Sequence, residues 1–68
     1  MEVYKRGSKI YIKWECEKSE DIKKAQELYN KLTRQGWLAA IHDGELKRIL
    51  KFDPEYEELW FIPRVEGG

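Results

Sequence analysis

The chain has 68 residues, of which 13 are basic and 13 acidic, with one histidine and one cysteine. A chain of this length forms one domain and buries only about 60% of its unfolded surface, which is too little to enclose a deep active site. Zero formal net charge removes the simplest argument for a nucleic-acid-binding protein, because phosphate binding draws on an excess of Lys and Arg. The longest apolar run, residues 37–41, is far shorter than the roughly 20 residues that span a bilayer. We therefore expect a single cytoplasmic domain over residues 1–68, with no membrane segment.

The first sixteen residues predict a β-hairpin. Residues 3–5 form a short strand, and Gly7-Ser8 is a turn signal. Over residues 10–16 apolar and polar side chains alternate, the period of a half-buried strand. This alternation predicts that Cys16 faces the core, where a buried thiol is inert. A lone cysteine also cannot form an internal disulfide.

A helix is predicted over residues 20–35. Ser19 is the expected N-cap, and Glu20 and Asp21 suit the positive end of the helix dipole. Gly36 is placed to end the helix as its C′ residue. Apolar residues recur at three- and four-residue steps and form the stripe that packs on the sheet: Ile22, Ala25, Leu28, Tyr29 and Leu32.

The second half of the chain predicts three more strands. Residues 37–42 read as a buried strand, Asp43-Gly44 as a hairpin turn, and residues 46–52 as the returning strand. After a break at Asp53-Pro54, residues 59–62 form the last strand. The predicted fold is α+β and β-grasp-like, with one helix on a mostly antiparallel sheet and the order β-β-α-β-β-β.

Charge is distributed unevenly along this order. The first 52 residues carry 12 basic and 8 acidic groups, a net charge of +4. The last 16 carry Arg64 against five acidic groups, a net charge of −4. The zero net charge thus arises because the basic first 52 residues and the acidic last 16 residues cancel. The abundance of Lys and Glu, with one Asn and two Gln, resembles the usage of hyperthermophile proteins and is also typical of designed chains.

No catalytic or metal-binding constellation stands out. His42 is the only histidine, so no histidine pair can hold zinc, and no nucleophile accompanies it. The chain has no glycine-rich phosphate loop. We therefore predict that the protein is not an enzyme and has no cofactor and no metal site.

One strand face has the residue types of a nucleic-acid-binding surface. Lys9, Tyr11 and Lys13 share that face, and rings flanked by cations are how sheets bind single strands. The alternative is a solvated face on which the lysine stems cover the tyrosine, and the Glu15 and Glu17 that follow would repel phosphates. The sequence therefore offers, as the second of two functions, a small protein-interaction domain, of which a module that binds single-stranded nucleic acid on this face is one form.

The other function follows from the end of the chain. The pattern Phe61-x-Pro63-x-Val65-x-Gly67-Gly68 resembles the tail of the ubiquitin-like sulfur carriers, which include the small subunit of molybdopterin synthase and the thiamine-pathway carrier protein. The resemblance implies a β-grasp fold whose residues 66–68 form a flexible tail. It also implies that an adenylating partner enzyme activates the Gly68 carboxylate and that Gly67 lets the tail enter a narrow site.

The resemblance further implies where the partner docks. Within the last strand, one alternate pair of apolar side chains must point away from the helix, and such a patch marks a contact surface. A covering loop or a second copy is the alternative to a docking enzyme. The expected docking residues are Leu59, Trp60, Phe61, Ile62 and Val65, rimmed by Glu57 and Glu58.

Overall fold

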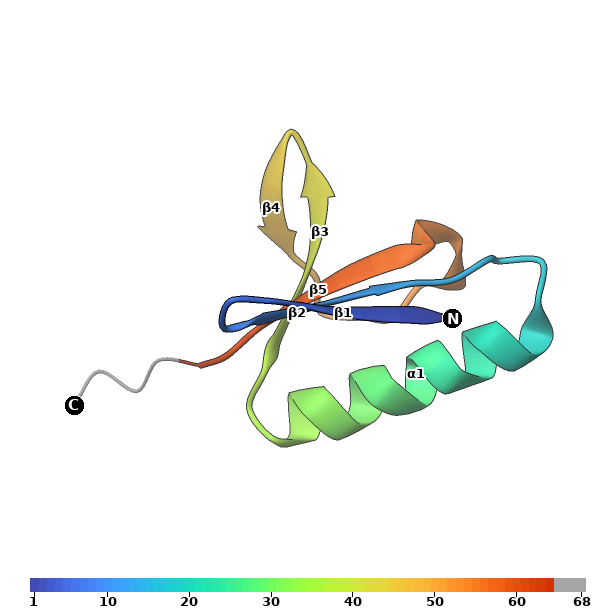
Figure 1. The fold of residues 1–68 in the computed structure, drawn as a ribbon, viewed down its shortest axis with the longest axis horizontal. Helices are drawn as coiled ribbons and strands as arrows, with labels where there is room; N and C mark the ends of the chain where they lie inside the picture. The colour runs from blue at the N-terminus through green and yellow to red at the C-terminus, as the bar shows by residue number, and fades with distance from the viewer. Residues whose placement is uncertain (65–68) are drawn as a thin grey trace.

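Residues 1–64 are described by the structure, a computed structural model. A single helix, α1 (Ser19–Arg34), packs on one face of a five-stranded antiparallel sheet (Figure 1). The predicted fold class and the order β-β-α-β-β-β are confirmed. The strands are β1 (Glu2–Arg6), β2 (Lys9–Lys13), β3 (Leu38–Asp43), β4 (Glu45–Arg48) and β5 (Glu58–Ile62).

The last strand lies in the middle of the sheet. The strand order is β1-β2-β5-β3-β4, so β5 joins the hairpin β1–β2 to the hairpin β3–β4. Both of its neighbours run antiparallel to it. Strand β1 lies at one edge of the sheet and β4 at the other.

Glycines form both predicted hairpin turns. Gly7 has a φ of 61°, and Arg6 pairs with Lys9 across a two-residue loop. Because Ser8 has no positive φ, this loop is a type II′ turn, which requires its glycine at the first central position. Gly44, with a φ of 76°, turns the chain between β3 and β4.

The helix begins one residue earlier than predicted. Ser19 is already helical, the N-cap is Lys18, and no side chain caps the helix. The predicted role of Ser19 is therefore wrong. Asp21 of the first turn instead accepts a hydrogen bond from the Met1 amino group, 3.1 Å away, which fastens the start of β1 to α1. The C-terminal end agrees with the prediction, since Gly36 has a φ of 100° directly after the Gln35 C-cap.

The core lies between α1 and the sheet. Trp14 is buried in it, stacks on Phe52 with ring centroids 5.5 Å apart, and donates its indole N–H to the Pro54 carbonyl at 2.9 Å. The predicted helical stripe is confirmed, since all five of its residues lie in the core or pack against it. The buried cluster consists of Ile12, Trp14, Ala25, Leu32, Ala39, Leu59 and Phe61.

Two strands end earlier than predicted. Strand β2 stops at Lys13 because the chain turns toward the helix, with the Lys18 N–H bonded to the Glu15 carbonyl. Cys16 lies in that turn and is exposed, so its predicted burial is wrong. Strand β4 stops at Arg48, well before residue 52, and Leu50 is left 78% exposed. Alternating apolar residues predicted these strands but not where they end.

The helix does not have the length and apolarity of a membrane span. Its 16 residues include acidic side chains in the first turn and basic ones in the last. Within residues 1–64, no helix could cross a bilayer.

Candidate binding face of the sheet

The sheet has one face without a helix. On β2, Ile10 and Ile12 point toward α1, so Tyr11 points the other way. The register of the neighbouring strands then decides which side chains share the face of Tyr11. We call this surface the free face. Its residues include Glu2, Tyr4, Arg6, Lys9, Tyr11, Lys13, His42, Leu46, Arg48, Glu58, Trp60 and Ile62.

Three aromatic rings cross the middle of the free face. Tyr4 is the strand partner of Tyr11, and Tyr11 is the partner of Trp60. The Tyr4 and Tyr11 rings are stacked with centroids 6.0 Å apart, and the Tyr11 and Trp60 centroids are 4.6 Å apart. These distances are those of favourable aromatic pairs. The rings therefore form a continuous aromatic row across β1, β2 and β5.

Cations surround the aromatic row. Lys9 and Lys13 stand two positions before and after Tyr11 on the same strand. Glu2 and Glu58 are the acidic members of the free face, so its strand residues carry a net charge of +2. The free face is thus net positive although the whole chain is neutral. The four cationic side chains are Arg6, Lys9, Lys13 and Arg48.

A hydrogen bond fixes the central ring of the row. The Tyr11 hydroxyl donates to Oε2 of Glu58 at 2.8 Å. Burial of the phenol, followed by this hydrogen bond, raises the pKa of Tyr11 to about 12. The Tyr11 ring is therefore uncharged near neutral pH and can stack with another flat group. Glu58, one of the two acidic side chains of the free face, accepts its hydrogen bond.

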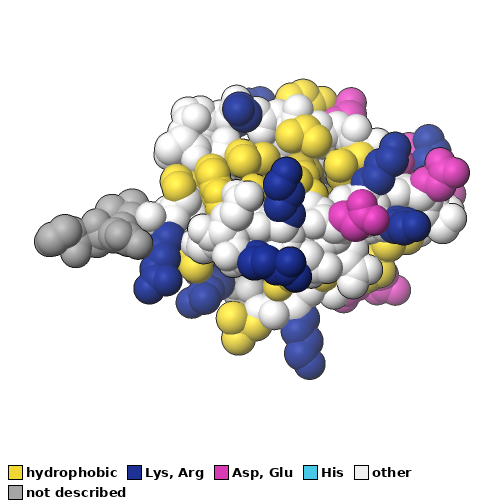
Figure 2. Space-filling model, turned by 90° about the horizontal axis from the view of Figure 1, so that it is seen from below, with side chains coloured by type: hydrophobic (Ala, Val, Ile, Leu, Met, Phe, Trp, Pro, Cys, Tyr) yellow, Lys and Arg dark blue, Asp and Glu magenta, His cyan; other side chains and the backbone are white. Residues whose placement is uncertain are grey.

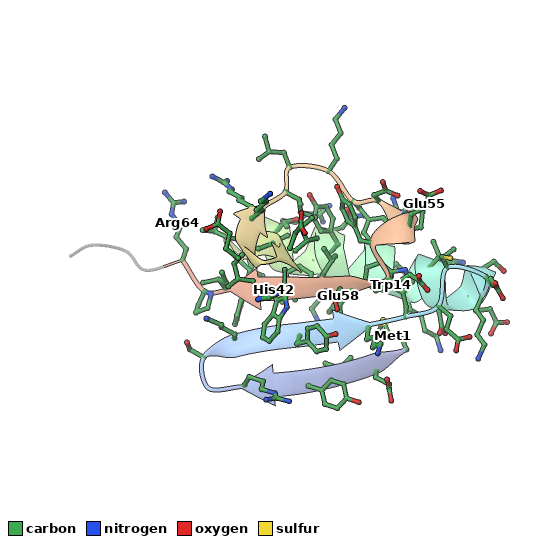
Figure 3. The ribbon with its side chains drawn as sticks, turned by 90° about the horizontal axis from the view of Figure 1, so that it is seen from above. Met1, Trp14, His42, Glu55, Glu58 and Arg64 are labelled. Carbon is green, nitrogen blue, oxygen red and sulfur yellow. The ribbon has the colours of Figure 1, made fainter. Side chains whose placement is uncertain are left out.

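The row ends in a hollow on the side of β3 and β4. Its walls come from Lys9, His42, Leu46 and Trp60, and its volume is about 340 Å³. Figure 3 views the molecule from the side opposite the helix and labels His42 and Glu58, which lie over the middle of the sheet. Cationic and aromatic groups thus meet at the end of the row.

The opposite side of the molecule differs in character. Figure 2, seen from the helix side, shows a band of hydrophobic side chains with Lys and Arg side chains scattered along it. Between α1 and the edge strand β1 there is a groove, lined by Met1, Val3, Lys24, Glu27, Leu28 and Lys31. This groove contains no aromatic side chain.

The structure brings the predicted nucleic-acid residues together. Lys9, Tyr11 and Lys13 lie together on the free face, as predicted. The alternation expected for β5 is also confirmed, because Trp60 and Ile62 are half-buried on the free face.

The predicted docking residues are divided between the core and the surface. Leu59 and Phe61 are completely buried under α1 and present no side chain to a partner, so their predicted docking role is wrong for the folded protein. Glu57 is exposed at the start of β5, and Glu58 is bonded to Tyr11. Val65 and the expected tail of residues 66–68, which includes Gly67 and Gly68, lie outside the described residues.

The sequence alone did not identify Tyr4 and Trp60, two members of the aromatic row, as residues of a nucleic-acid-binding surface. Tyr4 could have been found, because a two-residue turn at Gly7-Ser8 places it opposite Tyr11. Trp60 could not, since its position depends on which strand pairs with β5, and no local signal predicts that pairing.

The free face is therefore the candidate functional site. Within residues 1–64, no group of three or more His, Cys, Asp or Glu side chains is placed to hold a metal ion. Comparison of the chain with protein-family models, with curated proteins and with solved structures found no match.

Proposed function

We propose that the protein binds single-stranded nucleic acid on the free face of its sheet. The observation that supports this is the aromatic row of Tyr4, Tyr11 and Trp60, flanked by Lys9 and Lys13. Every base has a flat apolar face that can stack on such rings, and each stacked base contributes about 1–3 kcal/mol. Binding of this kind tolerates many base sequences.

The spacing of the rings favours one binding geometry. Neighbouring rings in the row are already in contact, with centroids 6.0 Å and 4.6 Å apart, so a base does not enter between them. Bases instead lie over the row, on the outward surfaces of Tyr4 and Trp60. The strand would then cross β1, β2 and β5, with its phosphates beside Lys9, Lys13 and Arg6.

Electrostatics predicts the salt dependence of this binding. Each phosphate that a cation neutralises on a single strand contributes about −0.7 to the slope of log affinity against log salt concentration. Contacts from Arg6, Lys9, Lys13 and Arg48 would give a slope of about −3. Glu2 and Glu58 on the same face repel phosphates and lower the affinity. Binding should therefore be measured at low salt, where the attraction between cations and phosphates is strongest.

The test is fluorescence anisotropy with labelled single-stranded oligonucleotides of DNA and RNA, titrated over a series of salt concentrations. The double variant Lys9→Ala/Lys13→Ala should flatten the slope by about 1.4, because it removes two phosphate contacts. The matched control is Lys23→Ala/Lys24→Ala, which removes two exposed lysines from α1 and should leave the slope unchanged. Absence of binding at low salt would exclude this function.

A second function, that of a ubiquitin-like sulfur carrier or modifier, has separate support. The supporting observation is the place of β5, whose described end leads through Pro63 to Arg64 at the outer end of the molecule (Figure 3). In this role ATP and the Gly68 carboxylate would form an acyl adenylate with release of pyrophosphate. A sulfur donor would then displace AMP to give a thiocarboxylate.

Under this proposal the protein is a substrate and the free face docks the enzyme. Trp60 and Ile62 offer apolar surface beside Glu58, which agrees with the docking predicted for this strand. Incubation with ATP, sulfide and an adenylating enzyme of the sulfur-carrier class should replace one oxygen of Gly68 by sulfur, detected by mass spectrometry. A chain lacking Gly68 is the control, and an unchanged mass of the complete chain would count against the carrier role.

A further inference from the structure

The edge strand β1 has an unused row of backbone hydrogen-bonding groups. Within residues 1–64, β1 pairs only with β2, and all five of its residues are exposed. It contains no proline, and its register with β2 runs without a bulge from Glu2 to Arg6. Edge strands of this kind are templates for pairing with another strand, because nothing blocks their free N–H and C=O groups.

The hairpin turn determines which groups are free. In a two-residue hairpin the residues that flank the loop exchange backbone hydrogen bonds, so Arg6 and Lys9 form a hydrogen-bonded pair. Hydrogen-bonded and non-hydrogen-bonded pairs then alternate along the ladder, so Tyr4 and Glu2 are also bonded to β2. The N–H and C=O groups of Val3 and Lys5 therefore point outward from the sheet.

We propose that two copies of the chain associate through their β1 edges, antiparallel and centred on Tyr4. A two-fold axis at Tyr4 pairs Val3 with Lys5 of the second copy, and Lys5 with Val3 of the second copy. These are the residues whose backbone groups point outward, so the pairing satisfies them reciprocally. The two sheets become one, with both free faces on the same side.

Charge complementarity identifies a second copy as the occupant. Glu2 and Arg6 lie two residues before and after Tyr4 on the same face. Two-fold pairing centred on Tyr4 places Glu2 of each copy opposite Arg6 of the other, giving two ion pairs. Both are non-hydrogen-bonded pairs, the kind in which opposing side chains come closest. The edge is thus complementary to itself.

The same charges select the register. A shift that centres the axis on Lys5 would place the two Lys5 side chains opposite each other, where like charges repel. A shift that centres it on Val3 would leave Arg6 beyond the end of the opposing strand. The register centred on Tyr4 keeps both ion pairs and also brings the two Tyr4 rings together.

The association covers exposed apolar surface on both faces. On the helix side Val3, which is 52% exposed, would lie against the aliphatic stem of Lys5 from the second copy. On the free face the aromatic row would continue from Tyr4 into Tyr4 of the second copy. The inference does not depend on nucleic-acid binding, since it rests on β1 alone.

Analytical ultracentrifugation over a concentration series is the first test. The mass should rise from 8.2 kDa toward twice that value as concentration increases. Glu2→Arg or Arg6→Glu should weaken association at least tenfold, because each makes both cross-strand pairs repulsive. The double variant Glu2→Arg/Arg6→Glu re-creates the two ion pairs in reverse and should restore association. Glu45→Arg on the other edge strand, β4, is the control and should leave association unchanged.

Amide hydrogen exchange, measured by NMR at low and high concentration, is the second test. The Val3 and Lys5 amides should become protected as concentration rises, whereas those of Tyr4 and Arg6, already bonded to β2, should not change. Monomer mass at every concentration would overturn the proposal. A dimer that leaves the Val3 and Lys5 amides unprotected, or a folded double variant that stays monomeric, would overturn it equally.

Discussion

The Tyr11 hydroxyl donates a hydrogen bond of 2.8 Å to Oε2 of Glu58, across the boundary between the N-terminal hairpin and the last strand. Lys13, not Tyr11, is the strand partner of Glu58, so the bond runs diagonally over the free face. It joins residues 47 positions apart in the chain. Its consequences for the titration of Tyr11 can be measured.

Stability should fall at high pH because of Tyr11. Burial and the hydrogen bond to Glu58 raise the pKa of Tyr11 from 10.0 to about 12, so the folded protein keeps a proton that the unfolded chain loses. The stabilising contribution is complete below pH 10 and is lost as pH rises from about 10 to 12. Urea denaturation across this range should show a smaller loss of stability in Tyr11→Phe than in the wild type.

Tyr56→Phe serves as the control for that measurement, because Tyr56 lies outside the aromatic row in the short 3₁₀ helix Pro54–Tyr56. If Tyr11→Phe and the wild type lost stability in parallel over this window, the assigned role of Tyr11 would be wrong.

Two tryptophans should separate binding from folding. Trp60→Ala removes a platform from the free face, so single-strand affinity should fall by about 1–3 kcal/mol while the salt slope stays unchanged. Trp14→Ala empties a buried site and breaks the bond to Pro54, so the free energy of unfolding should fall by about 3–5 kcal/mol. Oligonucleotide titration and thermal denaturation of both variants test this. If Trp60→Ala and the wild type bound the oligonucleotide with equal affinity, the aromatic row would not be part of the binding site.

Local patterns predicted much of the fold. The period of the apolar residues located α1 within one residue at each end, and Gly7 and Gly44 marked both hairpins. The free-face position of Tyr11 followed from alternation alone. These features depend on neighbours in the sequence, which is why they could be predicted.

The remaining features depend on distant segments. Nothing near Trp60 predicts that β5 lies between β2 and β3, because that pairing is decided by how the two hairpins pack. Cys16 was misplaced since alternation continues in sequence after the strand itself has turned toward α1. The full aromatic row needed the strand order and was therefore visible only in three dimensions.

The Cys16 thiol should be accessible but slow to react. Desolvation, then the charges of Glu57 and Glu17, raise its pKa, so little reactive thiolate is present near neutral pH. The Cys16 N–H also donates to Oε2 of Glu57 at 3.4 Å. Glu57→Gln should lower the pKa of the thiol and so speed its alkylation by iodoacetamide. The rate of alkylation is measured by mass spectrometry. Glu27→Gln on α1 is the control; an equal acceleration there would show that the effect is not local.

Glu57 is also a site where the backbone limits stability. Its φ of 60° lies in the left-handed region, which is unfavourable for a residue with a Cβ. Glu57→Gly should raise the free energy of unfolding by up to about 1 kcal/mol, whereas Glu57→Ala keeps the strain. Chemical denaturation of both variants measures the difference. If glycine were no more stable than alanine at this position, backbone strain would not be the reason.

The central place of β5 has a consequence for how the protein is made. Each hairpin holds together segments that are synthesised early, but residues 58–62 must leave the ribosome before the two hairpins can join. Until then the apolar side chains of both hairpins have no shared sheet to cover them. Folding therefore waits until residues 58–62 have left the ribosome. It is dominated by contacts between distant parts of the chain, which makes it slower than for a helical domain of the same length.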